Sequence, residues 1–444
     1  MTPVRPTVTT ELPARVRRGY ALGSVATGTF GTVPGLLLLP YLTDEIGIGA
    51  ALAGVLVFAP KAWDVVLNPI AGRISDRSTH PAGRRRPFLV RAGLTLAVLF
   101  AVMFAGPTEP QALAAAWVAV AFLGCASAYA FFQVPYVAMP AELTLDYAER
   151  TRLMTWRVVV LALAILVSGA TAPIVADQLG HAAMGAYVGL VIALGVLGAW
   201  WGTRGAPEHP TETAGGTFAD QLRLVAQNPD FRAVLLTFVV QAAAIGTVLA
   251  GVAYVADDLL DSTAANTFLF VAFVGPALLV TPLWERYATT RGKRSGYAVA
   301  TVFLVIGMAA LLAAHEGWLA LTYVAAALVG IGYAGAQVFP MAMLPDVAAD
   351  DASRSGANRI GVFTGVWTAG ETLGLALGPG IFALVLTAGG YVSSTSGVTV
   401  DQPDGARLAI ALGFSVLPAL LSAISLVLLR GYRLDDRLRS ADVA

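Results

Sequence analysis

Apolar stretches of about 20 residues recur along the whole chain of 444 residues and are separated by short polar segments. A helix of that length spans the hydrocarbon core of a bilayer, because each residue adds about 1.5 Å along the axis. Only 13% of the residues are charged, whereas soluble proteins carry about 25%. We therefore expect an all-α membrane protein with twelve transmembrane helices, near residues 20–42, 51–72, 87–106, 111–138, 153–176, 183–203, 232–256, 265–284, 295–313, 318–344, 358–387 and 408–430.

The connecting segments alternate in charge from one predicted helix to the next. Those on one side carry acidic residues and, among basic residues, only Arg407. The opposite segments and the two tails hold nearly all the arginines and Lys293. Basic segments remain in the cytoplasm. We therefore expect both termini in the cytoplasm and a multi-pass protein of the cell inner (plasma) membrane.

A long polar segment divides the predicted helices into two sets of six. We expect a cytoplasmic tail at 1–19, an N-terminal bundle at 20–203, a cytoplasmic linker with a short amphipathic helix at 204–231, a C-terminal bundle at 232–430 and a tail at 431–444. An internal repeat supports this division, since QVPYVAMPAE at 133–142 matches QVFPMAMLPD at 337–346. Two six-helix bundles are the architecture of transporters that bind solute near the midplane.

Two predicted helices carry ionisable side chains near their centres. Lys61 and Asp64 lie in the second helix, with Asn68 one turn further on, and Glu371 lies in the eleventh. An ionised side chain there costs at least about 2.5 kcal/mol, so it is retained only if it is paired, hydrated or functional. We predict that Asp64, Asn68 and Glu371 bind a coupling cation, either a proton or a sodium ion. The alternative for Asp64 is a structural ion pair with Lys61.

A second group of side chains is suited to a polar solute. Arg157 begins the fifth helix and can form forked hydrogen bonds to hydroxyl or carboxylate groups. Tyr136, Trp156 and Trp367 could stack on a sugar, and Lys61 lies close to them in the predicted bundle. Arg157 could instead anchor the helix at the membrane surface, and the aromatic residues could be core or interfacial residues.

The loop after the second helix is a predicted cytoplasmic gate. It contains Asp76, Arg77 and the run Arg84, Arg85 and Arg86. Pairing of this loop with neighbouring helix ends would hold the gate closed, with Glu142 and Asp346 as acidic partners at the matched ends of the fourth and tenth helices. The alternative is that the basic run only sets the topology.

Four stretches together resemble the glycoside–pentoside–hexuronide:cation symporters of the major facilitator superfamily, which include the melibiose/sodium symporter and, more distantly, sucrose/proton symporters. They are WDVVLNPIAGRISDRSTHPAGRRRPF, PYVAMPAELTLDYAERTRLMTWR, MLPDVAADDASRSGANR and VWTAGETLGLALGPG. The resemblance touches both halves of the chain. It implies the major facilitator fold, transport coupled to a cation, a cation-binding role for Asp64 and a sugar-binding role for Arg157.

Several positions depart from the pattern of that family. Asn68 stands where the melibiose carrier has a second aspartate, and Gly28 and Gln133 stand where it binds sugar with aspartates. Thr372 replaces a lysine that many members have. Gln133 therefore remains a predicted substrate-binding residue, but galactoside specificity does not carry over. One carboxylate fewer favours a proton over a sodium ion.

The resulting prediction is symport of a sugar, glycoside or similar small polar solute by alternating access, with a proton favoured over sodium. A drug or metabolite efflux antiporter and a lysolipid transporter of the same superfamily are the alternatives. The four histidines fall in predicted loops and no carboxylates cluster, so we expect neither an enzyme, a cofactor nor a metal beyond sodium at Asp64. The net charge of zero gives no reason to expect a nucleic-acid partner. We expect a monomer in the lipid bilayer.

Overall fold

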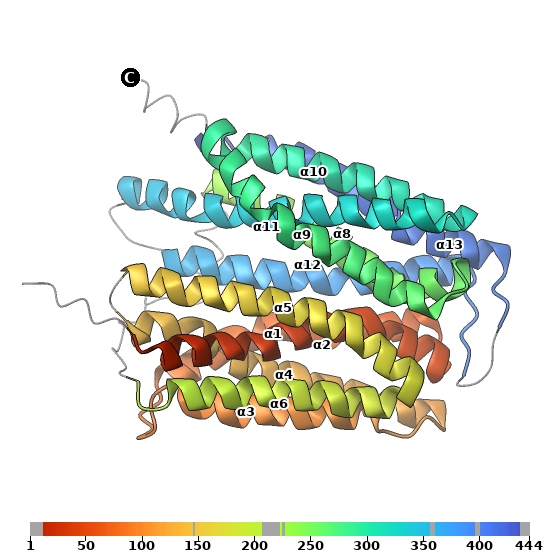
Figure 1. Ribbon diagram of the computed structural model, residues 1–444, viewed down its shortest axis with the longest axis horizontal. Helices are drawn as coiled ribbons and strands as arrows, with labels where there is room; N and C mark the ends of the chain where they lie inside the picture. Colours follow the sequence, from red (N-terminus) through yellow and green to blue (C-terminus); the bar gives the residue numbers. More distant parts are fainter. Residues whose placement is uncertain are drawn as a thin grey trace, which may run out of the picture.

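The computed structural model describes residues 12–144, 147–206, 223, 227–355, 360–395 and 400–435. Within these residues the secondary structure is helical (Figure 1). The first half comprises α1 (Ala14–Pro40), the π-helical turn η1 (Tyr41–Glu45), α2 (Ala50–Asp76), α3 (Arg86–Phe104), α4 (Gln111–Leu143), α5 (Tyr147–Leu179) and α6 (His181–Thr203). The second half comprises α8 (Pro229–Tyr254), η2 (Val255–Leu259), α9 (Thr263–Arg291), α10 (Lys293–Ala310), η3 (Leu311–Glu316), α11 (Leu319–Ser355), α12 (Ile360–Ala388), α13 (Asp404–Phe414) and α14 (Val416–Leu429).

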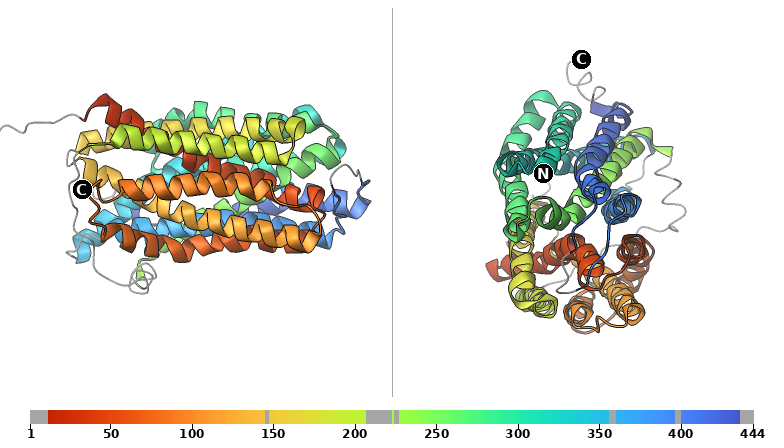
Figure 2. Two further views of the ribbon diagram at one scale, coloured as in Figure 1. Left: turned by 90° about the horizontal axis from the view of Figure 1, so that it is seen from below. Right: turned by 90° about the vertical axis from the view of Figure 1, so that its right-hand side faces the viewer.

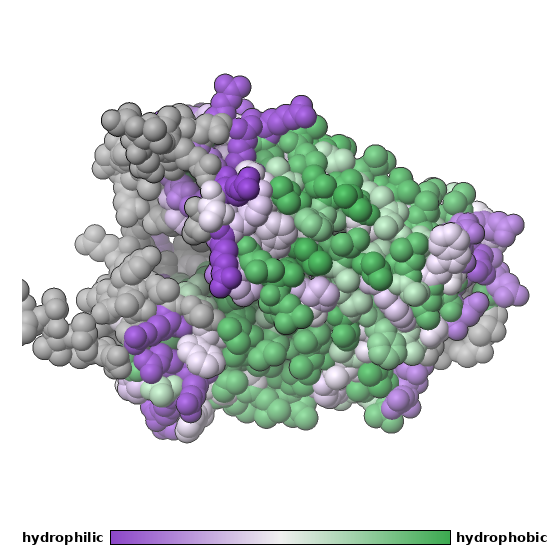
Figure 3. Space-filling model, turned by 45° about the horizontal axis from the view of Figure 1, so that its top comes forward, coloured by the Kyte–Doolittle hydropathy of each residue, from purple (hydrophilic) through white to green (hydrophobic). Residues whose placement is uncertain are grey.

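The outer surface of the helices is suited to lipid rather than to water. In the described ranges twelve helical segments are long and apolar enough to cross a bilayer, which confirms the expected number. Large apolar side chains point outward, including Val120 and Leu279, which are 72% and 79% exposed. Figure 3 shows that these surfaces form a broad apolar belt, with hydrophilic residues gathered at its two ends. A soluble monomer rarely exposes a contiguous apolar surface of this extent, so the belt marks a multi-pass membrane protein.

The helices form two bundles that correspond to the two halves of the chain. In the first, α1 packs on α5 and α6, and α3 packs on α4 and α6. In the second, α8 packs on α12 and α14, and α11 packs on α9 and α10. The view along the helices in Figure 2 separates the two groups. The bundles meet mainly where α2 packs on α12, α5 on α9 and α1 on α8, so residues on these six helices can form a site between the bundles.

The molecule has two distinct ends along the helix axes. We call the end with residues 12–18, 84–86 and 430–435 the terminal end; it lies on the left of Figure 1. The opposite end, with residues 41–49, 255–262 and 389–395, is called the distal end. The acidic segments of the sequence lie at the distal end and most basic segments lie at the terminal end.

Both halves begin with the same local structure. At the distal end α1 passes into η1 and α8 passes into η2, each a single π-helical turn. The wider turn is closed by a hydrogen bond from the N–H of Ile46 to the carbonyl of Tyr41 in one case, and from Leu260 to Val255 in the other. A tyrosine precedes two acidic residues in both segments, in YLTDE at 41–45 and YVADD at 254–258. This correspondence is a further internal repeat, in addition to the match between 133–142 and 337–346.

Several helices extend past the apolar stretches from which they were predicted. At the terminal end α4 continues to Leu143 rather than 138, and α11 continues to Ser355 rather than 344. α1 begins at Ala14, inside the expected tail 1–19. Helical backbone hydrogen bonds form in polar turns just as they do in apolar turns. A prediction from hydropathy alone therefore underestimates the length of these helices. The expected amphipathic linker helix lies outside the described residues, apart from residue 223.

The twelfth transmembrane span is divided into α13 and α14. The break falls at Ser415, with φ −121° and ψ −73°. Pro418 lies in the first turn of α14, where it cannot donate the hydrogen bond to Phe414 that a continuous helix requires. The expected single helix over 408–430 is therefore two helices in one span.

Candidate functional site

Hydrogen bonds join the two bundles at the distal end. The Tyr391 hydroxyl, beyond α12, donates to Asp44 Oδ1 of η1 at 2.6 Å. The Thr43 and Tyr254 hydroxyls lie 2.7 Å apart, and the Ser394 N–H donates to the Thr43 carbonyl at 3.0 Å. Burial, reinforced by the Asp44 carboxylate, raises the pKa of Tyr391 well above its ordinary value, so the phenol is a neutral donor. We call this set of contacts the distal latch.

Close backbone packing accompanies the distal latch. A Cβ added at Gly54 of α2 would lie 2.5 Å from the Cβ of Ala383 of α12, and one added at Gly169 of α5 would lie 2.1 Å from Phe270 of α9. The Thr267 hydroxyl also donates to the carbonyl of Ala170 at 3.2 Å. Small residues allow membrane helices to approach this closely. The distal end is therefore sealed by backbone contact as well as by hydrogen bonds.

At the terminal end, the described ion pairs of the first half stay within one bundle. Arg85 Nη2 lies 2.8 Å from Glu142 Oε1 at the end of α4, and Arg84 Nη1 lies 3.7 Å from the same atom. The Arg86 guanidinium donates to the carbonyl of Ala206. Of the predicted gate residues, Arg84 and Arg85 thus meet Glu142, whereas Arg86 contacts the segment after α6. Asp76 is the last residue of α2 and Arg77 is exposed in the following turn; the side chain of Asp76 lies outside the described part.

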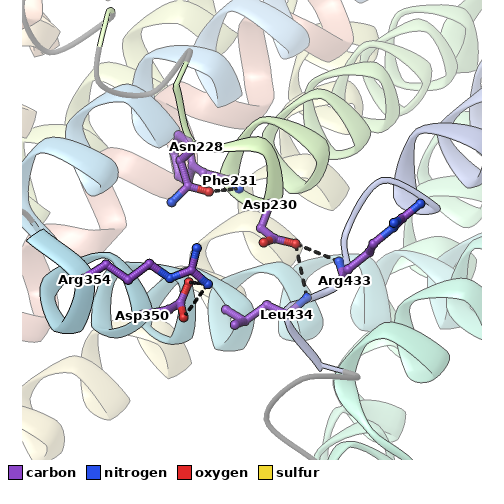
Figure 4. A network of polar contacts seen from close by, with 7 residues as sticks. All are labelled: Asn228, Asp230, Phe231, Asp350, Arg354, Arg433 and Leu434. Atoms are coloured by element: carbon purple, nitrogen blue, oxygen red, sulfur yellow. Dashed lines mark hydrogen bonds and ion pairs between the residues drawn. The ribbon is translucent and has the colours of Figure 1, made fainter.

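The second half has a matching arrangement at its terminal end. Lys293 at the start of α10 pairs with Asp346 of α11, as Arg85 pairs with Glu142. Asp230 Oδ1 accepts hydrogen bonds from the N–H groups of Arg433 and Leu434, at 2.7 and 3.1 Å (Figure 4). Figure 4 also shows the neighbouring Asn228 cap and the Asp350–Arg354 ion pair on α11. Part of the expected tail 431–444 is thus packed on the bundle, with Leu434 only 1% exposed.

Asp64 lies in the middle of α2 and is 2% exposed. Its Oδ1 atom has no hydrogen-bond partner among the described residues. Lys61, one turn earlier, is close enough to act electrostatically on this carboxyl, and its Nζ lies 4.9 Å from the ring centre of Phe30 of α1. Asn68 is half-buried one turn later. The carboxyl therefore has one cation beside it and one free acceptor atom.

Arg157 of α5 rests on an aromatic platform. Its Cζ lies 5.7 Å from the ring centre of Tyr136 of α4. That ring stacks on Tyr20 with the ring centres 4.7 Å apart, and its hydroxyl donates to the Tyr20 carbonyl at 2.8 Å. The Ser24 hydroxyl lies 2.8 Å from the same phenol. Tyr136 is fully buried, and its predicted contact with a solute stays a prediction.

Glu371 of α12 connects this cluster to the second bundle. It is half-buried, and Arg157 is the cation that acts on it. Tyr129 of α4 lies within electrostatic reach of Asp64, Arg157 and Glu371. Three of the predicted site residues, from α2, α5 and α12, therefore share one region between the bundles, with Tyr129 among them.

The remaining predicted solute-binding residues are placed differently. Gln133 is half-buried on α4, and its Oε1 has no hydrogen-bond partner in the described ranges. Trp367 is 2% exposed and stacks on Phe238 at 4.4 Å, in the second bundle. Trp156 is 51% exposed and lies beside Arg157 in sequence only. A solute role for each stays a prediction, and Trp156 is the least enclosed of the three.

Sequence reasoning missed several residues at this site. Phe30, Tyr129 and Tyr333 surround the charged residues, and a small pocket in the second bundle is lined by Phe238, Gln241, Tyr333, Gln337 and Glu371. Aromatic residues in apolar helices are usually core residues, so only the bundle geometry distinguishes these. Among the described residues no group of three histidine, cysteine or carboxylate side chains could hold a metal ion. A sodium ion at Asp64 would need the oxygens of Asn68 and solvent.

Two helical bundles joined around a buried charged cluster and sealed at one end are the features of a membrane transporter. The chain belongs to the family described as MFS/sugar transport protein, which matches residues 19–436. This membership confirms the resemblance to the glycoside–pentoside–hexuronide:cation symporters and the major facilitator fold. It also means that the chain is a transporter and not an enzyme.

The similarity to individual proteins extends over nearly the whole chain. The isoprimeverose transporter of Lactiplantibacillus pentosus is 22% identical, over 96% of this chain and 89% of the relative. Sodium-dependent lysophosphatidylcholine symporter 1 of Mus musculus is 23% identical, over 95% of this chain and 85% of the relative. The crystal structure of the nucleoside transporter NupG has a TM-score of 0.65 at 11% identity, covering 95% of this chain and 98% of the other. At that identity the structural likeness shows the fold alone.

Proposed function

We propose that this protein is a cation-coupled symporter of a sugar, glycoside or similar small polar solute. A proton is favoured over sodium as the coupling ion, because one carboxylate and one amide on α2 offer fewer hard oxygen ligands than a sodium site usually has. The family description and the isoprimeverose transporter among the relatives support the solute class.

The observation that carries this proposal is the charged cluster between the bundles. Asp64 belongs to one bundle, Glu371 belongs to the other, and Arg157 acts on Glu371 across the boundary. In this proposal a cation that binds Asp64 weakens the attraction between this carboxyl and Lys61. The solute accepts hydrogen bonds from the Arg157 guanidinium. Both events change the electrostatic interactions between the two bundles. Alternating access requires such a change, because one bundle moves relative to the other.

The distribution of charge supports a terminal end in the cytoplasm. Basic residues dominate that end, as the positive-inside rule requires. With this orientation the closed distal latch faces outward, and the structure corresponds to a carrier closed to the outside. The ion pairs of Arg85 with Glu142 and of Lys293 with Asp346 then hold each cytoplasmic loop to its own bundle; a gating role for these loops is part of the proposal.

A single coupled charge is enough to make uptake useful. Moving one elementary charge through about 100 mV releases about 2.3 kcal/mol. That energy supports roughly fifty-fold accumulation of a neutral solute.

Transport by purified protein in proteoliposomes tests this function. A pH-sensitive dye enclosed in the vesicles reports proton entry, and an imposed sodium gradient tests the other ion. The panel contains monosaccharides, disaccharides, glycosides and uronides. We expect one class of these solutes to acidify the vesicle interior as it enters. A panel without any solute-driven proton or sodium movement contradicts the proposal.

A lysolipid is the second candidate solute, because a relative that covers 95% of this chain is named as a lysophosphatidylcholine symporter. The same vesicles distinguish the two. Uptake of a fluorescent lysophosphatidylcholine without uptake of any sugar would assign the chain to lipid transport. If a sugar is taken up and excess lysolipid does not change this uptake, a lysolipid is excluded as the solute.

A further inference from the structure

A cavity lies on the outside of the first bundle, between its helices and the loop that precedes α3. It has a volume of about 420 Å³ and is bounded by the α2–α3 loop, α3 and α4. We call it the lateral groove. α3 packs mainly on α4 and α6, which belong to the same bundle. The groove is therefore separate from the charged cluster, and the exposed side chains of Val98, Val120 and Leu123 around it belong to the apolar belt.

One end of the lateral groove is basic and polar. Arg91, His80 and Ser78 line it there. Arg91 is exposed, and neither a hydrogen bond nor an ion pair to another described residue satisfies its guanidinium. His80 Nδ1 already accepts a hydrogen bond from the Ala82 N–H at 3.1 Å, which leaves Nε2 as the donor of the neutral ring. No acidic side chain occurs among the described residues of the lining.

The other end of the lateral groove is apolar and lies deeper in the membrane. Arg91 is the sixth residue of α3, so it lies about 8 Å along the axis from the start of that helix. Thr95 is one turn deeper on the same face, and α4 contributes Gly124, Ser127, Ala128 and Phe131 to the lining. The Ser127 hydroxyl donates to the Leu123 carbonyl at 2.8 Å. A polar group can therefore lie at the membrane surface while a hydrocarbon chain follows α3 and α4 inward.

We propose that the lateral groove binds an anionic glycerophospholipid from the leaflet next to the terminal end. The phosphodiester would accept forked hydrogen bonds from Arg91 and one from His80, and an acyl chain would lie along Thr95 and Phe131. Basic pockets between transmembrane helices recognise anionic headgroups in this way. An arginine within a transmembrane helix needs a partner or water, and an anionic headgroup supplies that partner.

Native mass spectrometry of the detergent-solubilised full chain tests the lipid site. The probes are phosphatidylglycerol and phosphatidylcholine with identical acyl chains. We expect the wild-type protein to retain phosphatidylglycerol about five-fold more than phosphatidylcholine. Arg91→Gln should abolish the preference, whereas Arg91→Lys should retain part of it. Thr95→Phe, which fills the apolar half, should lower the retention of both lipids.

Arg291→Gln is the matched control, because it removes the same charge from an exposed position at the terminal end of α9. It should retain lipids as the wild type does. Equal retention by Arg91→Gln and wild type would overturn the proposal, and so would an equal loss in both arginine variants. If the wild type is a dimer and Arg91→Gln is a monomer, the groove binds a second copy of the chain, and the lipid proposal is wrong. Monodisperse elution of each variant confirms that it is folded.

Discussion

Asp64 is a buried carboxyl in the middle of a membrane-spanning helix. It is almost fully buried, one carboxylate oxygen has no partner in the described part, and Lys61 is the cation beside it. This carboxyl can therefore bind or release a cation without breaking a hydrogen bond to another described residue. Asn68 cannot replace it, because an amide neither carries a charge nor takes up a proton at ordinary pH.

Asp64→Asn should uncouple transport from the cation. The amide keeps the size of the side chain but removes the only carboxyl group of α2 other than that of Asp76, which ends the helix. We expect accumulation of the solute to fall to equal internal and external concentrations, while exchange of labelled for unlabelled solute continues. Asp401→Asn, at an exposed distal position, is the control and should accumulate normally. Unchanged accumulation by Asp64→Asn would show that another group couples the cation.

Arg157 and Glu371 should behave as a coupled pair. Each charge neutralised alone leaves the other unpaired in a poorly hydrated region, which destabilises the protein, whereas neutralising both leaves no unpaired charge. We expect Arg157→Gln and Glu371→Gln each to lower the apparent unfolding temperature in detergent, and the double variant to lower it by less than the sum. Glu371→Gln combined with Arg407→Gln, which lies at the distal end, should be additive. Additivity in both pairs would contradict the proposed contact.

At the scale of elements, the distal latch depends on how η1 meets the segment that follows α12. Tyr391 and Asp44 are 347 residues apart in the chain. Two further contacts at this end use backbone carbonyl groups as acceptors. Ser394 Oγ donates to the carbonyl of Asp44 in η1 at 3.1 Å, and Ser393 Oγ donates to the carbonyl of Ile48, just after η1, at 2.8 Å. The latch therefore depends on the π-helical turn, because the carbonyls of Thr43 and Asp44 in this turn accept hydrogen bonds from Ser394.

Tyr391→Phe should shift the carrier toward a state open at the distal end. Loss of one hydrogen bond of about 1 kcal/mol changes a two-state population about five-fold. Spin labels at Glu109→Cys and Glu316→Cys, on a Cys125→Ser background, would report the separation of the bundles by double electron–electron resonance. We expect Tyr391→Phe to increase the fraction of molecules in which the two spin labels are further apart.

The control for this experiment is Tyr187→Phe. It removes a comparable hydrogen bond of 2.9 Å to Thr171, but this bond lies inside the first bundle. Its distance distribution should match that of the parent protein. A Tyr391→Phe distribution that also matches the parent would mean that packing at Gly54 and Gly169 alone keeps the distal end closed.

The elements that could be predicted are those with a local signal. Twelve apolar stretches predicted twelve spans, and a charge inside an apolar stretch singled out Asp64 and Glu371. The break at Ser415, the π-helical turns and the Tyr391–Asp44 contact could not be predicted in the same way. They depend on proline geometry within an apolar run or on the arrangement of two bundles. Tyr129 was missed because its neighbours on the helix do not distinguish a site residue from a core residue.

At the scale of the whole molecule, the two halves repeat each other at several levels. α4 and α11 match in sequence, η1 and η2 match in local structure, and Arg85–Glu142 corresponds to Lys293–Asp346 at the terminal end. A carrier built from two similar halves can exchange which end is closed by a small rotation of one half against the other. The orientation of the whole molecule in the membrane then determines the direction from which a solute enters.

The topology should be measurable with one cysteine at a time. Cys125 is buried and can be replaced by serine. Asp401→Cys at the distal end should react with a membrane-impermeant maleimide in intact cells, because the acidic end is expected to face outward. Thr79→Cys, in the α2–α3 loop at the terminal end, should react only after permeabilisation. The reverse pattern would invert the proposed orientation.

The distal latch has a consequence for how strongly the carrier binds its solute from each side. Two latch hydrogen bonds of about 1 kcal/mol each would reduce the distal-open population of the empty carrier about thirty-fold. The apparent affinity for a ligand is weakened by the fraction of protein that can receive it. A solute offered at the distal face would therefore half-saturate the carrier at a higher concentration than one offered at the terminal face. The difference in apparent affinity between the two faces would then be set at Tyr391 and Asp44, far from the residues that are predicted to bind the solute.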